Sequence, residues 1–309
     1  MNEIKIFSPA TVANISCGFD VLGLCLDTVG DEMVVRKTKD KKITITKITG
    51  HDLPYEPENN VAGVAALSLF EHLQPDCGFE IEIHKKIKPG SGIGSSAASA
   101  SGTVFAMNEL LGKPLSNEEL VPFAMKGEEL ASKAWHADNV APVLLGNFTL
   151  IRSYEPLDII SINAPDNLYA TVIHPQVAIK TSEARGVMPK SIELKKAIKQ
   201  TGNMGGLISG LFTSDYELIG RSLHDEFAEP YRASLIPNFN ETKEASLQAG
   251  ALGCGISGSG PSIYALSKGK EIAEKVGKAM ENCFKNTTIN YEIHVSKINT
   301  QGIKTLESN

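Results

Sequence analysis

The chain has 309 residues, of which 42% are hydrophobic and 21% charged, and its formal net charge is −6. This composition is typical of a globular protein, and the length favours two domains. The negative charge argues against nucleic acid or an acidic membrane as a partner, because both attract basic surfaces. A phosphate ligand must therefore be held by local geometry and not by a basic protein surface.

The five cysteines are odd in number and scattered, and no Cys-x-x-Cys pair occurs. This pattern fits reduced thiols better than a disulfide framework or a zinc site. No run of 18 apolar residues occurs, and the first residues lack the apolar core of a signal peptide. We therefore expect a cytoplasmic protein that does not enter a membrane.

The first part of the chain mixes strands with helices. Alternation of polar and apolar residues predicts strands over 4–7, 32–37, 42–48, 78–84 and 146–152. We expect Ser8-Pro9 to end the first strand. Helices are predicted over 61–73, after the capping residues Asn59-Asn60, over 100–111, and from a capping box at Ser116 and Glu119 to about Lys133.

Prolines and Asp/Asn residues interrupt the pattern between Tyr154 and Asn167, which predicts domains over residues 1–160 and 161–309. Beyond this point we expect strands over 168–173, 252–256, 262–266 and 291–295. Helices are expected over 192–211, 216–223, 237–249 and 270–283. Strands mixed with helices in both halves indicate an α+β or mixed α/β protein.

The stretch 88–99, which reads KPGSGIGSSAAS, lies between a predicted strand and a predicted helix. Its alternating glycines, Gly90, Gly92 and Gly94, allow backbone N–H groups to approach an anion closely. A helix N-terminus favours the same charge, and the neighbouring serines add hydroxyl groups. We expect this loop to hold the phosphates of a nucleotide.

The kind of nucleotide follows from what the loop lacks. None of the three Gly-Lys pairs is followed by Ser or Thr, so there is no Walker A motif. Residues 92–97 and 253–258 match the dinucleotide fingerprint, but a strand-like run follows the second match. The first lacks a clear acidic strand end about 20 residues later. A nucleoside triphosphate with Mg²⁺ fits better, since Ser95, Ser96 and a glutamate such as Glu128 or Glu129 could supply oxygen ligands.

Polar residues elsewhere indicate an acceptor site. His136, Asp138 and Asn139 lie between a predicted helix and an apolar run, and two separate cations, Arg185 and Arg232, could grip a carboxylate or a phosphate. Structural roles stay open, because a single histidine or glutamate is more often structural and Asn14 and Asp20 also suit turns. The residues alone support an ATP-dependent phosphotransferase with a small polar acceptor.

Five segments resemble one family, the galactokinase, homoserine kinase, mevalonate kinase and phosphomevalonate kinase (GHMP) superfamily. Residues 88–99 resemble its P-x-x-x-G-L-G-S-S-A-A signature, and residues 253–262 resemble its third motif. Residues 8–23, 136–142 (H-x-D-N-V-A-P) and 229–237 look like the forms found in homoserine kinases. One departure is Lys88, which stands where the family usually has proline, while Trp135 and Ala137 also differ from the usual residues.

The resemblance implies an α+β fold with a ribosomal-protein-S5-like N-terminal domain and a ferredoxin-like C-terminal domain. It implies transfer of phosphate from ATP, with Mg²⁺, to L-homoserine, a step of threonine biosynthesis, and it suggests a homodimer. Two alternatives stay open: another GHMP kinase acting on mevalonate or a sugar, and a non-catalytic nucleotide-binding module.

Site residues are also implied by the resemblance. Asn59 would contact adenine, and the triphosphate would lie on Lys88, Pro89, Gly90, Ser91, Gly92, Ile93, Gly94, Ser95, Ser96, Ala97, Ala98 and Ser99. Mg²⁺ would be ligated by Ser96 and Glu128. The homoserine positions are Asn14, Asp20, His136, Asp138, Arg185 and Arg232, and Thr181 would neighbour the reacting phosphoryl group. Asn139 stands where other members carry an aspartate suited to act as a base, so we expect catalysis without a strong base.

Overall fold

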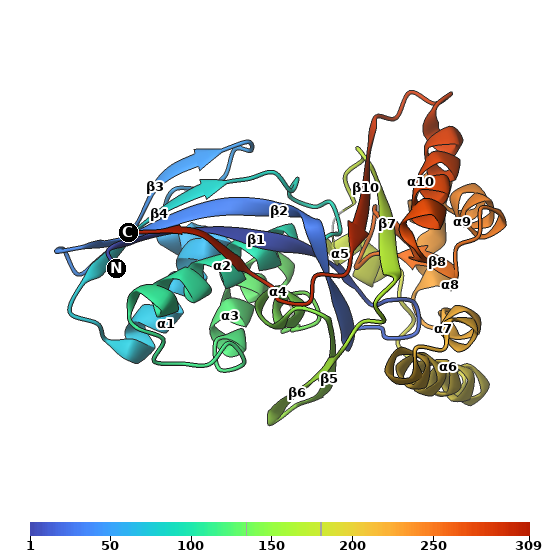
Figure 1. Ribbon diagram of the computed structural model, residues 1–309, viewed down its shortest axis with the longest axis horizontal. Coiled ribbons are helices and arrows are strands. Elements are labelled where there is room, and N and C mark those ends of the chain that lie inside the picture. The colour runs from blue at the N-terminus through green and yellow to red at the C-terminus, as the bar shows by residue number, and fades with distance from the viewer. Residues whose placement is uncertain (134, 180) are drawn as a thin grey trace.

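The computed structural model describes residues 1–133, 135–179 and 181–309, without the side chains of Ser132, Thr181 and Ser182. The chain forms two lobes, and each lobe is a β-sheet with helices packed on one face (Figure 1). The two termini lie together at the far end of the first lobe, where the Asn2 N–H donates to the Asn309 carbonyl at 2.7 Å.

The first sheet has seven strands, with β11, β1, β2, β4 and β3 in that order, while β5 pairs with β2 and β6 pairs with β5. The strands are β1 (Glu3–Ala13), β2 (Leu22–Thr38), β3 (Ile43–Thr49), β4 (Gly78–His84), β5 (Phe148–Tyr154), β6 (Leu157–Ile162) and β11 (Lys304–Ser308). Among the described strands of this sheet, β3 and β4 are the one parallel pair, and a helix connects them.

The prediction that Ser8-Pro9 ends the first strand was wrong. β1 continues to Ala13, with Pro9 opposite Gly30 of β2. Proline is tolerated there because β11 pairs with β1 over residues 4–7, so Pro9 lies beyond this pairing and needs no N–H group for it. The extension carries the chain from the first sheet to the boundary between the lobes.

Strands β6 and β11 were not predicted. Because β11 pairs with β1, the last residues of the chain lie in the first sheet, although the predicted division assigned them to a domain of residues 161–309. The division at residue 160 therefore stays a prediction about folding units.

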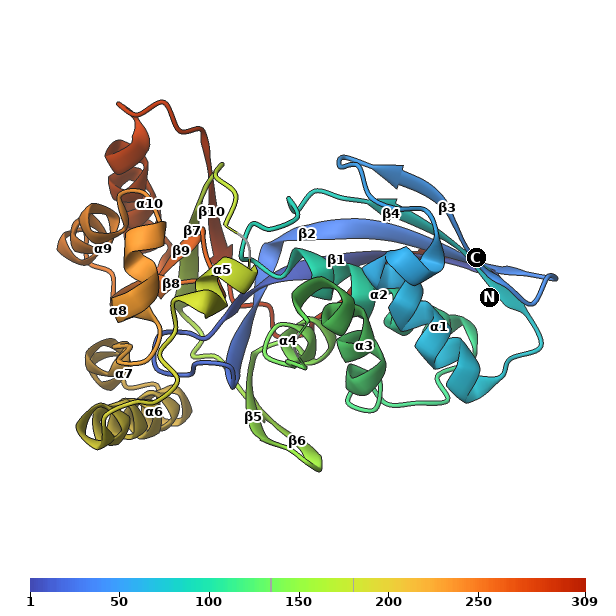
Figure 2. The same ribbon diagram turned by 180° about the vertical axis from the view of Figure 1, so that it is seen from behind.

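Four helices cover one face of the first sheet (Figure 2). They are α1 (Val61–Leu73), α2 (Ser95–Leu110), α3 (Val121–Ser132) and α4 (Val140–Leu145), and a 3₁₀ turn spans Pro57–Asn59. Asn60 caps α1 by accepting the Ala62 N–H. The hydrogen bonds of the predicted capping box form, with the Ser116 N–H donating to Glu119 at 2.8 Å, but α3 begins later than predicted, at Val121, and Leu120 at its start provides no side-chain cap. Helix α2 begins five residues before its predicted start and is buried along nearly its whole length.

The second sheet is antiparallel, with the order β10, β7, β9, β8. Its strands are β7 (Leu168–Pro175), β8 (Gly253–Ile256), β9 (Ile263–Lys268) and β10 (Tyr291–Lys297). Helices lie between β7 and β8 and between β9 and β10: α5 (Thr181–Gly186), α6 (Leu194–Thr213), α7 (Tyr216–Ser222), α8 (Glu229–Arg232), α9 (Phe239–Gln248) and α10 (Lys270–Phe284). This order of strands and helices is the split β-α-β pattern of ferredoxin-like folds, as predicted.

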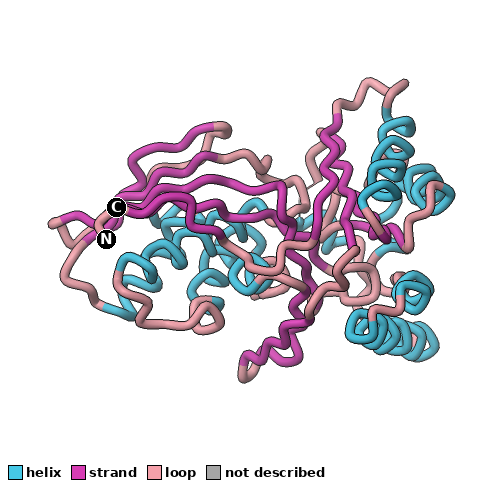
Figure 3. Tube along the Cα trace, in the orientation of Figure 1, coloured by secondary structure: helices cyan, strands magenta, loops and turns pink. Residues whose placement is uncertain are grey.

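The lobes share part of their core. Val12 and Leu24 of the first sheet belong to the same buried cluster as Leu207 of α6 and Tyr264 and Leu266 of β9. The tube view shows the long strands of the first sheet running up to the second sheet (Figure 3). The loops at this boundary, from both lobes, are therefore held close together.

Among the described residues, no helix is long and apolar enough to cross a membrane.

Candidate functional site

A cavity of about 340 Å³ lies where the loops of the two lobes meet. Most of the residues singled out from the sequence line it. They are Asn14, Asp20, Pro89, Gly90, Ser91, Gly92, Gly94, Ser95, Ser96, Ser99, Glu128, His136, Asp138, Asn139, Arg185 and Arg232. Segments separated by more than 200 residues in the sequence thus contribute to one site.

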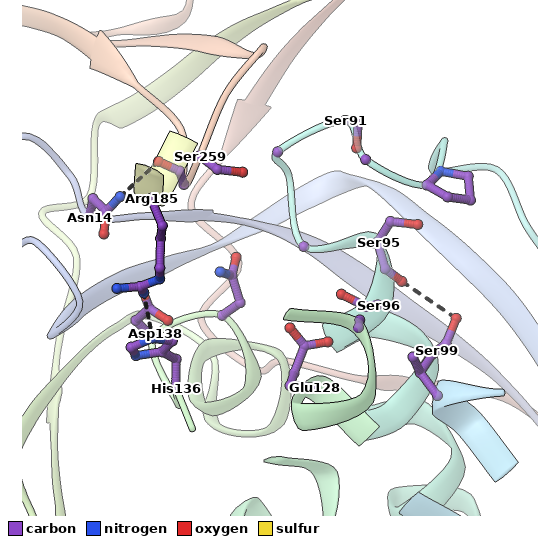
Figure 4. A pocket seen from close by; sticks show the side chains of 18 of the residues that line it. Asn14, Ser91, Ser95, Ser96, Ser99, Glu128, His136, Asp138, Arg185 and Ser259 are labelled. Carbon is purple, nitrogen blue, oxygen red and sulfur yellow. Dashed lines mark hydrogen bonds between the residues drawn. The ribbon is translucent and has the colours of Figure 1, made fainter. Parts of the chain in front are cut away.

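The glycine loop ends at the N-terminus of α2, which opens on this cavity (Figure 4). Gly92 and Gly94 have φ angles of 82° and 70°, in the left-handed region that disfavours side chains. A Cβ atom on Gly94 would lie 2.1 Å from Thr11 Oγ1, so only glycine fits. The helix N-terminus and this exposed backbone suit an anion.

The second glycine cluster, residues 253–262, packs against the first. Ser257 Oγ donates to the Gly92 carbonyl at 2.7 Å, and Ser262 Oγ donates to the Ser91 carbonyl at 2.6 Å. A Cβ atom on Gly92 would lie 2.6 Å from the Gly260 carbonyl oxygen. The fingerprint match at 253–258 therefore reflects a brace for the first loop and not a second nucleotide loop.

Ser96 and Glu128 form one side of the cavity, and Figure 4 shows their side chains directed toward each other. Burial raises the pKa of Glu128, while the Ser96 hydroxyl, by hydrogen bonding, and the Lys85 cation act to lower it. Lys85 is itself buried, and its ammonium contacts Asp31 and donates to the Ser95 carbonyl at 2.8 Å. This side of the site therefore holds oxygen donors beside a fixed cation.

The other side of the cavity gathers Asn14, Asp20 and Arg185. Arg185 donates from both terminal nitrogens to the Asp20 carboxylate at 3.1–3.2 Å. Asn14 Oδ1 accepts the Asp20 N–H at 2.9 Å, and its Nδ2 donates to the Gly258 carbonyl at 2.8 Å. Two residues that were predicted separately, one acidic and one basic, are thus paired with each other.

His136 lies beside this pair. Arg185 donates to His136 Nε2, so the histidine accepts at Nε2. Burial lowers the pKa of His136, against the raising effect of Asp20, and the two arginines lower it further. The imidazole is therefore neutral, with its proton on Nδ1.

Arg232 is only 3% exposed. Its Nε donates to the Ala184 carbonyl at 3.0 Å, and its Nη1 donates to the Gly258 carbonyl at 3.1 Å. The guanidinium groups of Arg232 and Arg185 lie 5.2 and 6.0 Å from the centre of the Phe19 ring. Fixed backbone partners and this ring hold the two cations close together at one end of the cavity.

Asn139 lies between the two sides. Its Oδ1 accepts the Thr11 hydroxyl at 2.7 Å and lies 3.2 Å from the place that a Cβ on Gly94 would occupy. With the oxygen engaged in this way, the amide Nδ2 donors are available to groups in the cavity. Thr11 was not singled out from the sequence, because nothing in its local pattern indicates contact with a residue 128 positions away.

Some predicted residues do not line the cavity. Lys88 donates to Gln176 Oε1 at 2.8 Å, Asn59 is exposed in the 3₁₀ turn, and the side chains of Ile93, Ala97 and Ala98 are buried in the core. The Thr181 side chain lies outside the described residues. Lys85, Leu53, Val61, Ala131, Gly258 and Ser259 also line the cavity but were not predicted as site residues.

Asp138 gives a pH prediction for the free protein. Burial, with the nearby charges of Asp20 and Glu128, raises the pKa of its carboxyl group to about 7. The folded state therefore binds a proton that the unfolded state releases near pH 4, so the free energy of unfolding falls as the pH rises from 4 to 7. Asp138→Asn has no carboxyl group at this position, so it should not lose stability in this way as the pH rises.

We expect Asp138→Asn to be more stable than the wild type at pH 8. The difference should be at most a few kcal/mol, because each unit by which the pKa differs between the folded and unfolded states corresponds to about 1.4 kcal/mol. The difference should vanish near pH 4. Urea unfolding of both proteins at pH 4.5, 6 and 8, without ligands, measures it. A constant difference at all three pH values would contradict the assignment.

The family comparisons agree with this architecture. The model of the GHMP kinases N terminal domain matches residues 59–147, and that of the GHMP kinases C terminal region matches residues 207–286. The structure of L. major mevalonate kinase in complex with R-mevalonate superposes with a TM-score of 0.72 over 95% of this chain and 96% of that one, at 16% identity. Fold and family models together define a kinase of the GHMP class.

Closer relatives narrow the class. A homoserine kinase of Chlorobium phaeobacteroides is 46% identical over 99% of this chain and its own full length. The crystal structure of homoserine kinase from Cytophaga hutchinsonii has a TM-score of 0.96 at 51% identity, over 99% of this chain and 98% of that one. The chain belongs to the homoserine kinase family of the GHMP kinases.

Proposed function

We propose that the protein transfers the terminal phosphoryl group of ATP to the side-chain hydroxyl of L-homoserine, giving ADP and O-phospho-L-homoserine. The observation that carries the proposal is the pairing of two unlike surfaces in one cavity. A glycine loop at a helix N-terminus forms one surface, and a cluster of both carboxylates and arginines forms the other.

The donor is assigned to the loop side. The backbone of residues 89–96 and the N-terminus of α2 suit the triphosphate, because N–H groups and the helix dipole favour negative charge. Leu53 and Val61, which flank Asn59 in the sequence, line the cavity, and this supports placing the adenine at this end. We assign Lys88 a structural role, its hydrogen bond to Gln176, and not a contact with the phosphates.

The acceptor is assigned to the charged side. Homoserine carries an ammonium and a carboxylate group, so its recognition needs both charges on the protein. Asp20 and Asp138 suit the ammonium, while Arg185 and Arg232 suit the carboxylate. Before the substrate binds, the charges of Asp20 and Arg185 neutralise each other in their ion pair. Mevalonate and sugars lack the ammonium and would leave the carboxylates poorly matched.

Ser96 and Glu128 fit a Mg²⁺ ion. Both offer oxygen atoms, and Mg²⁺ in nucleotide sites takes one or two protein ligands along with phosphate oxygens and water. So few protein ligands are consistent with the described residues, among which no three His, Cys, Asp or Glu side chains are grouped so that they could hold a metal ion. When bound, Mg²⁺ would neutralise charge on the phosphates.

The chemical step is assigned to positioning without a strong base. The acceptor oxygen forms a bond to the γ-phosphorus, and the bond from that phosphorus to the ADP oxygen breaks. The hydroxyl proton passes late to the transferred phosphate or to solvent, since a loose transition state asks little of the nucleophile. Asn139, held by Thr11, would donate a hydrogen bond to the reacting groups but cannot accept the proton.

Asn139→Asp tests this mechanism. A new carboxylate would lie next to Asp138 and would lose the donors that face the cavity, so we expect kcat to fall. The rate should show no new basic limb in its pH profile. A large increase in kcat together with such a limb would mean that a base does accelerate the reaction.

The proposed activity is tested by measuring ADP release with homoserine, mevalonate and galactose as acceptors. We expect turnover with homoserine alone, and mass spectrometry should find phosphate on its side-chain oxygen. The proposal would be contradicted if homoserine were not phosphorylated, or if all three acceptors were phosphorylated at equal rates. Binding of ATP without turnover of any acceptor would favour a non-catalytic nucleotide-binding module.

Two further assignments also remain proposals. A cytoplasmic location is supported by the five cysteines, all free thiols. The homodimer suggested by the family resemblance is compatible with the exposed apolar side chains Leu194, Ile198 and Phe212 on α6, and light scattering of the purified protein tests it.

A further inference from the structure

Gln200 lies on α6, outside the cavity, and is only 3% exposed. Its side chain uses both ends of the amide. Nε2 donates to the Cys17 carbonyl at 2.9 Å and to Asp225 Oδ1 at 3.3 Å, while Oε1 accepts the Glu226 N–H at 2.8 Å. A buried amide with all of these contacts joins two segments that are 208 positions apart, at residues 17 and 225.

The first segment carries Asn14 and Asp20. Four residues in it, Asn14, Ile15, Ser16 and Asp20, have positive φ angles between 41° and 71°. This conformation is unfavourable for side chains and especially for a β-branched residue, so surrounding contacts must hold it. The bond from Gln200 to the Cys17 carbonyl lies in the middle of this strained loop.

The second segment leads to Arg232. Asp225 accepts the N–H groups of Phe227 and Ala228 at 2.7 and 3.1 Å on Oδ1, and that of Glu229 at 2.9 Å on Oδ2. These bonds form the turn from which α8 begins, and Arg232 lies at the end of α8. Gln200 thus contacts the carboxylate that organises the start of the helix bearing this arginine.

The two segments also meet inside the cavity. Asn14 and Arg232 both donate to the Gly258 carbonyl, and the Phe19 ring lies beside Arg232. Outside the cavity, the Gln200 side chain bonds to both segments. Its hydrogen bonds thus connect the segment that carries Asp20 to the segment that carries Arg232 from outside the cavity.

We propose that Gln200 is a positioning residue that fixes the Asp20 segment relative to the Arg232 segment, and thereby sets the affinity for the zwitterionic acceptor. This inference rests on the proposed function for its kinetic consequence, but its structural consequence can be measured without any substrate. Among the described residues, the hydrogen bonds of the Gln200 side chain go to residues 17, 225 and 226 and not to the glycine loop, so we expect the nucleotide side to keep its affinity.

The test compares Gln200→Met with the wild type and with Gln248→Met. Methionine retains the length of the side chain and removes all three hydrogen bonds. Gln248 is an exposed residue of α9 whose amide donates to Glu244 at 3.1 Å, so the same change there controls for the chemistry of the substitution. Each protein is assayed for the KM of homoserine and the KM of ATP.

We expect Gln200→Met to raise the KM of homoserine about 5- to 10-fold, in line with the loss of one or two net hydrogen bonds, and to leave the KM of ATP unchanged. Gln248→Met should change neither. An unchanged KM of homoserine in folded Gln200→Met would overturn the proposal. Equal increases in both KM values with a lower Tm would do the same, because they indicate general destabilisation.

Hydrogen exchange of the ligand-free proteins separates this inference from the proposed activity. Amides of residues 14–20 and 225–232 should exchange faster in Gln200→Met, and those of residues 88–99 should not. If the wild type failed to phosphorylate homoserine while this pattern held, the activity would be wrong and the positioning role right. Unchanged exchange in both segments would overturn the positioning role whatever the substrate.

Discussion

Replacement of Arg232 by alanine should raise the KM of homoserine by about 30-fold or more, corresponding to a loss of roughly 2–5 kcal/mol of binding free energy. The guanidinium is buried at one end of the cavity, where a paired carboxylate would gain a strong, desolvated contact. Two backbone carbonyls hold its plane, so the group is ordered before the substrate arrives. The KM of ATP should stay near its wild-type value, because in the described part of the chain Arg232 bonds to the Ala184 and Gly258 carbonyls and not to the glycine loop.

Two further variants make this experiment specific. Arg232→Lys retains the charge but loses the forked geometry, and it should recover only part of the affinity. Arg152→Ala removes an exposed arginine that pairs with Asp158 on the β5–β6 hairpin, and it should leave both KM values unchanged. The Tm of each variant separates binding from folding. An unchanged KM of homoserine in Arg232→Ala would remove the arginine from the acceptor site.

Local features of the fold were predictable because their causes are local. The strand before the glycine loop follows from alternation of polar and apolar residues, and the capping box at Ser116 follows from two residues three positions apart. Strand β11 could not be predicted in this way. It has four exposed or half-exposed polar residues out of five, and only its pairing with β1, about 300 residues earlier, makes it a strand.

The same distinction applies to the candidate site. Asp20 and Arg185 were predicted singly, from separate motifs, but their mutual ion pair depends on how the lobes pack. Lys85 follows strand β4 and has two polar neighbours in the sequence, His84 and Lys86, so it would ordinarily be placed in solvent. Its burial against Asp31 is determined by α2 lying across the end of the strand, which sequence periodicity does not reveal.

Glu128→Gln should lower kcat by about 10²- to 10³-fold, the range found when a preorganised electrostatic contact is removed from a reaction centre. The carboxylate faces Ser96 in the cavity, and an amide of the same shape offers a cation a weaker ligand. The Mg²⁺ concentration that gives half-maximal rate should rise in parallel. The adjacent Glu129 supplies a matched control, because it pairs with Lys126 and does not line the cavity, so Glu129→Gln should retain wild-type kcat and Mg²⁺ dependence.

Stability decides whether the loss of rate is specific. Burial raises the pKa of Glu128, which means that the folded protein bears a cost for its charge at neutral pH. The neutral amide removes that cost, so Glu128→Gln should have a Tm equal to or above that of the wild type while its kcat falls. Such opposite changes are expected of a carboxylate retained for the reaction and not for folding. A lower Tm with an unchanged Mg²⁺ dependence would instead make Glu128 a structural residue and leave the metal site to be sought elsewhere.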